Sequence, residues 1–138
     1  MRVTLLICDA AQEMGGKLYI LGGGWSQIRK GGPKSPVNMA LAIVVSVPWD
    51  LANKNLKIDT KLMDEDGNPV STPDGRAIGA SGGLEVGRPT GIKPGTDLDA
   101  PLALTFNGMP LPPGGYRWEI DIDGEQQAIA PFRVLAPK

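Results

Sequence analysis

The run Gly79–Gly83, with the sequence GASGG, matches the G-x-S-x-G pattern found around the nucleophile of many hydrolases. Such a serine needs a neighbouring base to remove its proton. The chain has no histidine and a single cysteine, Cys8, so it cannot form a Ser-His-Asp or a Cys-His unit. Catalysis by carboxylates and lysines alone would need two buried carboxylates paired in a pocket. We therefore predict no catalytic residues and a protein that is not an enzyme.

Two acidic clusters are candidates for binding a metal ion. The run Asp64–Asp66 resembles the start of a calcium loop, but Gly67 comes too early and no acidic residue follows at the required distance. Asp121, Asp123 and Glu125 surround a second tight turn, where only weak metal binding is expected. We interpret both clusters as solvated turns and predict no metal and no cofactor.

Three cations, Arg29, Lys30 and Lys34, lie close together behind Trp25, and a second tryptophan, Trp49, follows the next apolar run. Basic loops with aromatic neighbours and exposed tryptophans are common in binding surfaces, so we predict that these five residues bind a protein partner. Solvated loop charges and tryptophans that cap the ends of the fold are the alternative interpretation. The formal charge of -1 (Lys+Arg 14, Asp+Glu 15) lacks the basic excess expected for nucleic-acid binding.

Short apolar runs closed by turn residues must position these side chains. The 19 glycines and 13 prolines of the chain lie between such runs, where they form turns. The sequence shows no sustained helical periodicity. The pattern predicts one all-β domain over residues 1–138, a β-sandwich of about eight mostly antiparallel strands, immunoglobulin-like or jelly-roll-like. The predicted strands are Arg2–Cys8, Lys17–Leu21, Val37–Val47, Asn55–Met63, a glycine-interrupted edge or bulged strand within Ala77–Val86, Ala100–Asn107, Tyr116–Ile122 and Gln126–Leu135.

The faces of these strands and the segments between them support further predictions. Apolar residues occupy both faces of Val37–Val47, which indicates a central strand, whereas the loop Trp25–Pro36 is expected to be exposed and mobile. Trp118 and Cys8 are predicted to be buried. The sequence before Tyr116, Pro-Pro-Gly-Gly, looks like the entry to the penultimate strand of immunoglobulin-like sandwiches, where a tyrosine marks a corner.

No apolar run approaches the ~20 residues of a membrane-spanning helix, and we interpret the first apolar run as a strand and not as a secretory signal.

The chain resembles an uncharacterised family of small all-β proteins from actinobacteria and, we infer, their bacteriophages. The resemblance spans most of the chain and is carried by four segments: Thr4–Gln12, Gly16–Trp25, Val47–Asp50 and Asp64–Gly67. It implies no established activity and no catalytic residues.

These observations predict a non-enzymatic structural or interaction module that docks on a protein assembly, such as an accessory or decoration component of a phage capsid, with homo-oligomerisation expected. It would then reside in the virion. The alternative is a small-ligand-binding domain in an actinobacterial cytoplasm, with the two tryptophans and the basic loop forming a lid over one end of the sandwich.

Overall fold

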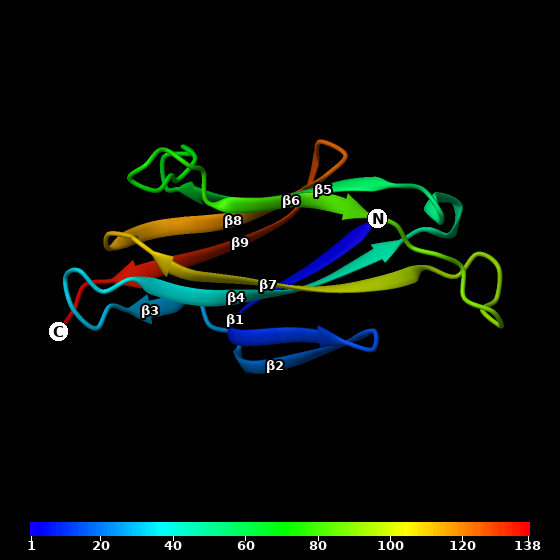
Figure 1. Ribbon diagram of the computed structural model, residues 1–138, viewed down its shortest axis with the longest axis horizontal. Coiled ribbons are helices and arrows are strands. Elements are labelled where there is room, and N and C mark those ends of the chain that lie inside the picture. Colours follow the sequence, from blue (N-terminus) through cyan, green and yellow to red (C-terminus); the bar gives the residue numbers. More distant parts are fainter.

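Alternating apolar strands make up most of the chain. The computed structural model describes residues 1–138 and contains nine strands and one short 3-10 helix (Figure 1). The elements are β1 (Arg2–Met14), β2 (Lys17–Gly23), β3 (Gln27–Arg29), β4 (Val37–Val47), η1 (Trp49–Leu51), β5 (Leu56–Asp64), β6 (Gly79–Leu84), β7 (Leu98–Met109), β8 (Gly114–Ile122) and β9 (Glu125–Leu135).

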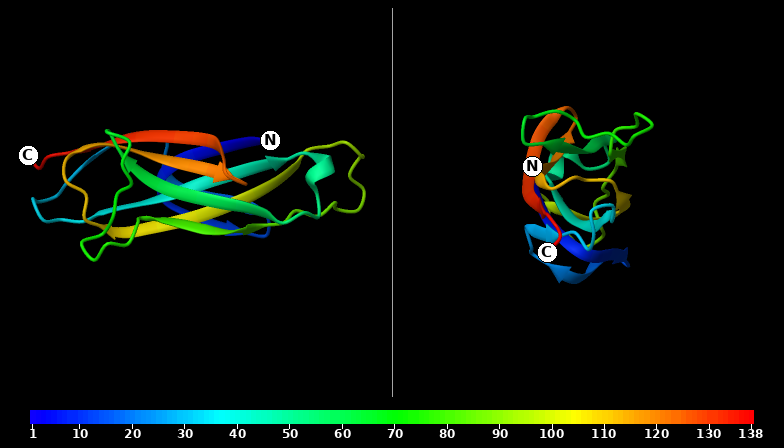
Figure 2. Two further views of the ribbon diagram at one scale, coloured as in Figure 1. Left: turned by 90° about the horizontal axis from the view of Figure 1, so that it is seen from above. Right: turned by 90° about the vertical axis from the view of Figure 1, so that its left-hand side faces the viewer.

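The strands form two sheets that pack face to face, with the strands running along the long axis of the molecule (Figures 1 and 2). The first sheet has the order β2-β1-β4-β7 and is antiparallel throughout. The second has the order β3-β9-β8-β5-β6 and is antiparallel except for the β3–β9 pair. The predicted β-sandwich is therefore confirmed, with nine strands where the sequence indicated about eight.

One hydrophobic cluster of 20 buried residues fills the space between the sheets. The two-faced strand β4 lies between β1 and β7, as predicted, and it contributes Met39, Leu41 and Ile43, which are fully buried. Trp118 of β8 is also fully buried, and its Nε1 donates a hydrogen bond to the Met39 sulfur at 3.2 Å. Cys8 is buried on the other face of the first sheet, so both burial predictions are confirmed.

Local turn chemistry fixes the registers of the hairpins. Asp123 and Gly124 have φ angles of 50° and 84°, the left-handed pair that a two-residue hairpin requires, and they join β8 to β9. The turn after β5 closes where the Asp64 N–H donates to the Asn68 carbonyl at 2.9 Å. At the start of β8 the Tyr116 hydroxyl donates to the Pro112 carbonyl at 2.6 Å, so the predicted tyrosine corner is present.

Two predicted segments differ from the structure, and a third had been left with two interpretations. The first strand does not end at Cys8 but continues to Met14, because its last residues pair with β2 in a long hairpin although their sequence does not alternate. Three residues of the predicted mobile loop form β3, which the sequence analysis missed. The glycine-rich run is an edge strand, β6, with a continuous register to β5, so the edge interpretation is confirmed and no bulge occurs.

Candidate interaction surface

The predicted basic loop is partly incorporated into the second sheet. Because β3 pairs with β9, the Arg29 guanidinium reaches the Ala136 carbonyl at 2.7 Å. Lys30 is only 9% exposed, and its Nζ donates to the Leu111 carbonyl at 3.1 Å. The expectation of an exposed, mobile segment is therefore wrong for Lys30, whereas Lys34 is exposed.

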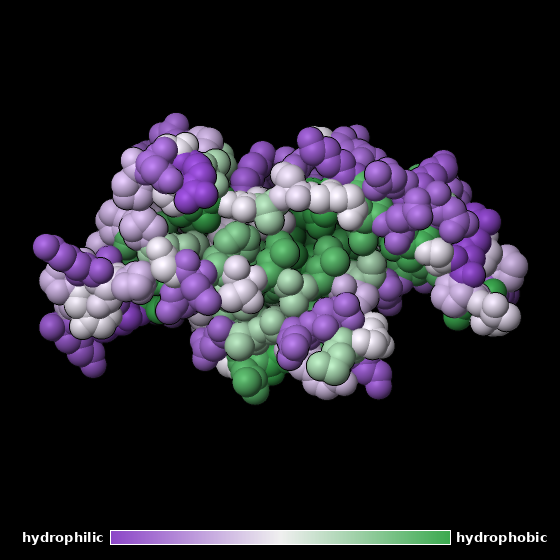
Figure 3. All heavy atoms as spheres, viewed as in Figure 1, coloured by the Kyte–Doolittle hydropathy of each residue, from purple (hydrophilic) through white to green (hydrophobic).

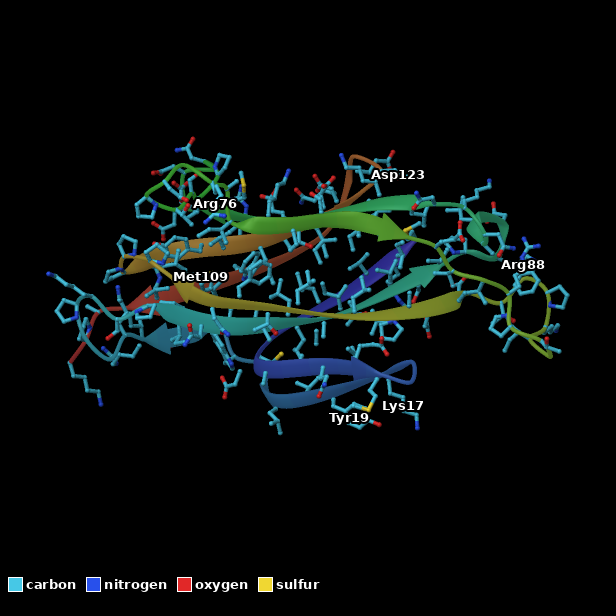
Figure 4. The ribbon with its side chains drawn as sticks, in the orientation of Figure 1. Lys17, Tyr19, Arg76, Arg88, Met109 and Asp123 are labelled. Carbon is cyan, nitrogen blue, oxygen red and sulfur yellow. The ribbon has the colours of Figure 1, made fainter.

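Of the two tryptophans, Trp25 begins this loop and Trp49 lies at the other end of the sandwich. Trp25 packs against the core, and its Nε1 is buried without a hydrogen-bond partner. Trp49 lies under the Arg88 guanidinium, 4.6 Å from the ring centroid, and Arg88 also donates to the Trp49 carbonyl at 2.8 Å. Figure 4 places Arg88 at one end of the sandwich and Met109, two residues before the Lys30 acceptor, at the opposite end. The structure does not assemble the predicted lid.

The outer face of the second sheet carries a network of charged side chains. Lys61 bonds Asp121 at 3.0 Å, and this hydrogen bond raises the pKa of the Lys61 ammonium. Asp121 lies opposite Asp59 on the adjacent strand, beside a hollow of about 390 Å³, and Asp59 accepts a hydrogen bond from the Ser81 hydroxyl. These carboxylates lie side by side on one sheet, whereas glycoside hydrolysis needs them opposed across a cleft.

Ser81 lies in the middle of edge strand β6, and the segment that follows β6 is irregular and not a helix. It therefore lacks the strand-to-helix turn that presents a nucleophilic serine. No group of three or more metal-ligating side chains occurs in the structure.

A different surface gathers exposed apolar side chains. The hairpin of β1 and β2, which we call the arm (residues 6–23), extends beneath the body of the sandwich, with Tyr19 near its outer edge (Figures 1 and 4). Five of the eight large exposed hydrophobic residues belong to it: Leu6 and Ile20 at 36% and 39%, Tyr19 at 55%, Met14 at 57% and Leu21 at 72%. Figure 3 shows hydrophobic residues reaching the surface there.

The arm borders a hollow of about 410 Å³ that it forms with β7. Ala10, Tyr19 and Leu21 line its arm side, and Thr105 lies across from them. Large apolar side chains beside a hollow lined by small residues can accept an apolar side chain or strand from another molecule. The arm is therefore the strongest candidate for an interaction surface.

Sequence reasoning missed the arm because an alternating pattern predicts which residues share a face and not whether that face is covered. A usable signal was present: after Lys17, β2 contains no charged residue and no proline, the devices that usually protect an edge strand.

These features define the molecule as a two-sheet β-sandwich with an apolar hairpin arm, and none of its helices has the length and apolar character to span a membrane. The chain belongs to a family of unknown function, DUF6941, whose pattern matches residues 3–135. The predicted membership of an uncharacterised family is confirmed.

No curated protein sequence matches the chain. Among solved structures, it is similar to the Pseudomonas fluorescens alkylpurine DNA glycosylase AlkC bound to DNA containing an abasic site analog. The two share 13% identity with a TM-score of 0.39, over 98% of this chain and 31% of that one, so this chain spans about a third of the glycosylase. A likeness of this size supports no inference about function.

Proposed function

We propose that the protein is a non-enzymatic interaction module that binds a protein assembly through its arm. The observation that carries this proposal is the concentration of five of the eight large exposed hydrophobic residues on one hairpin. With about 200 Å² for a fully exposed large side chain, these five leave about 500 Å² of apolar surface. This is about the size of the largest apolar patch on a typical monomer, about 300–600 Å², and such patches are often functional.

The finer proposal is an accessory or decoration component of a bacteriophage capsid, in an actinobacterial host, which would place the protein in the virion. It is supported by a small two-sheet sandwich, a hairpin with exposed apolar side chains and a formal charge of -1, which disfavours binding through nucleic-acid phosphates. A non-catalytic role is supported by the neutralised carboxylates: Glu119 is held by Arg117 at 2.5 Å, and Asp121 by Lys61.

Co-sedimentation with purified capsids tests the proposal. The wild-type protein should pellet with capsids, and Leu21→Lys should reduce the bound fraction, since a charge replaces the most exposed apolar side chain of the arm. Ile129→Lys is the matched control, because Ile129 is 48% exposed on the other sheet and should tolerate the same change. Wild-type protein that stays in the supernatant, or equal loss in both variants, would refute docking through the arm.

A second candidate, binding of a small apolar ligand, is supported by the 410 Å³ hollow beside Tyr19 and Leu21. Titration of metabolites followed by tyrosine and tryptophan fluorescence tests it. A saturable change that is lost in Leu21→Lys would support ligand binding, and no response from the folded protein would exclude it for the compounds tried.

A further inference from the structure

The exposed edge of the arm has free hydrogen-bonding groups that a second strand could use. Gly15 and Gly16, with φ angles of 60° and 79°, form a two-residue turn closed by the Met14–Lys17 pair. In such a hairpin the closing pair is hydrogen-bonded and the pairs alternate, so Tyr19 bonds to Gln12 of β1. The N–H and C=O groups of Leu18 and Ile20 consequently point away from β1, at the margin of the first sheet (Figure 2).

The other three sheet edges are less able to accept a strand. β3 has three residues, and β6 has six, three of them glycine. β7 is long but carries Pro101, which cannot donate a backbone hydrogen bond. Only β2 combines an unprotected edge with exposed apolar side chains on neighbouring positions.

We propose that the occupant of this edge is a second copy of the chain, paired antiparallel through β2 about a two-fold axis at Tyr19. This inference rests on the proposed function, because it names the partner that the arm binds. In this register Leu18 of each copy faces Ile20 of the other, which satisfies both outward-pointing residues and makes four intermolecular backbone hydrogen bonds. The two four-stranded sheets then form one continuous sheet of eight strands.

Side-chain chemistry favours this register. Tyr19 meets its own counterpart across the axis, and Leu21 faces the aliphatic stem of Lys17 of the other copy. The Asp9 carboxylate lies over Gly22, where a side chain at that glycine would collide with it. Antiparallel pairing therefore brings Lys17 of one copy to the end of the interface where Asp9 of the other lies, and these charges are opposite.

The exposed side chains of β2 supply part of a small interface. Tyr19, Ile20 and Leu21 expose about 330 Å² of apolar area per copy, at about 200 Å² for a fully exposed large side chain. Two copies together supply about 660 Å², to which the backbone edge adds, and specific interfaces start near 1,000 Å² in total. We therefore expect a weak dimer that forms at high protein concentration.

Sedimentation equilibrium of the purified protein alone tests this inference. We expect a species of twice 14.5 kDa for the wild type. Ile20→Lys should weaken the dimer by roughly a hundredfold, since each copy would place a charge at the interface, and Ile129→Lys should leave it unchanged. A monomeric wild type at high concentration, or a dimer that Ile20→Lys does not weaken, would overturn the inference.

Cysteine cross-linking tests the register. Directly opposed residues of a non-hydrogen-bonded antiparallel pair have Cα atoms about 4.5 Å apart, within disulfide range. Oxidised Tyr19→Cys should therefore form a covalent dimer. Leu21→Cys should not, although Leu21 is the more exposed position, because its counterpart lies four register positions away. Efficient cross-linking of Leu21→Cys alone would disprove the two-fold axis at Tyr19.

Different results would overturn the capsid proposal and the self-pairing proposal. A monomer that co-sediments with capsids would overturn self-pairing and retain docking on an assembly. A dimer with the expected cross-link that binds no capsid would retain self-pairing and overturn the capsid proposal.

Discussion

Replacing Tyr116 by phenylalanine removes one hydrogen bond and little else. The hydroxyl donates to the Pro112 carbonyl at 2.6 Å, whereas the ring stacks on Phe132 with centroids 5.6 Å apart and keeps that contact in the variant. A hydrogen bond of this kind contributes about 1 kcal/mol to the free energy of unfolding. At about 2.1 cal/mol/K of unfolding entropy per residue, a chain of this length should lose about 3 °C in melting temperature.

Thermal and urea unfolding measure this loss, and the chain offers a matched control. Tyr19, the only other tyrosine, is exposed on the arm and makes no side-chain hydrogen bond, so Tyr19→Phe should leave stability unchanged. If Tyr116→Phe melts at the same temperature as Tyr19→Phe, the corner hydrogen bond does not stabilise the fold.

The effect of Tyr116→Phe on the free energy of unfolding should also depend on pH. Burial, followed by the charges of Asp64 and Glu65, raises the pKa of Tyr116 above its ordinary value. The unfolded chain then releases this proton more readily, so the stability that the neutral phenol contributes is present below about pH 10 and is lost as pH rises through the folded-state value. The stability gap between wild type and Tyr116→Phe should therefore narrow above pH 10. A gap independent of pH would contradict the assignment.

Three further predictions concern packing, a buried amine and a thiol. Gly79→Ala should lower the free energy of unfolding by about 1–3 kcal/mol, because the added Cβ would lie 2.2 Å from a β5 carbonyl oxygen. The added Cβ of Gly82→Ala has no atom within 4 Å, so this variant should raise the free energy of unfolding by roughly 0.5 kcal/mol. Urea unfolding measures both changes. Lys30→Met should cost about 1–3 kcal/mol by leaving a loop carbonyl unpaired, whereas the exposed Lys34→Met should be neutral. Burial, with a smaller effect of a neighbouring carboxylate, raises the pKa of the Cys8 thiol. A thiol reagent should therefore modify Cys8 only after denaturation. Rapid labelling of Cys8 in the native protein would disprove its burial.

Local patterns predicted the parts of the fold that local chemistry determines. The alternation from Tyr116 to Ile122 and the Asp123-Gly124 turn were sufficient for the C-terminal hairpin, because period-two burial and a left-handed turn are properties of neighbouring residues. β3 could not be predicted in this way. Its three residues pair in parallel with β9, more than a hundred positions away, and that pairing also buries Lys30.

The five predicted partner-binding residues are not gathered on one surface, for a related reason. Cations and tryptophans near one another in sequence indicated a site, but the strands carry Trp49 and the basic loop to opposite ends of the molecule. Loops that follow one another in the sequence of a sandwich lie at opposite ends of the molecule, because each strand of about ten residues is roughly 30 Å long.

The arm contributes little to the hydrophobic core between the sheets. Of the 20 residues buried between the sheets, β1 contributes only Ile7 and β2 contributes none. Cys8 is buried with Ala40 and Ala42 in a separate small cluster on the outer face of the first sheet. Met14, Tyr19 and Leu21 of the arm are more than half exposed, so much of their apolar surface stays in water when the monomer folds and would release free energy only on association. The proposed contact with another chain would cover these exposed apolar side chains.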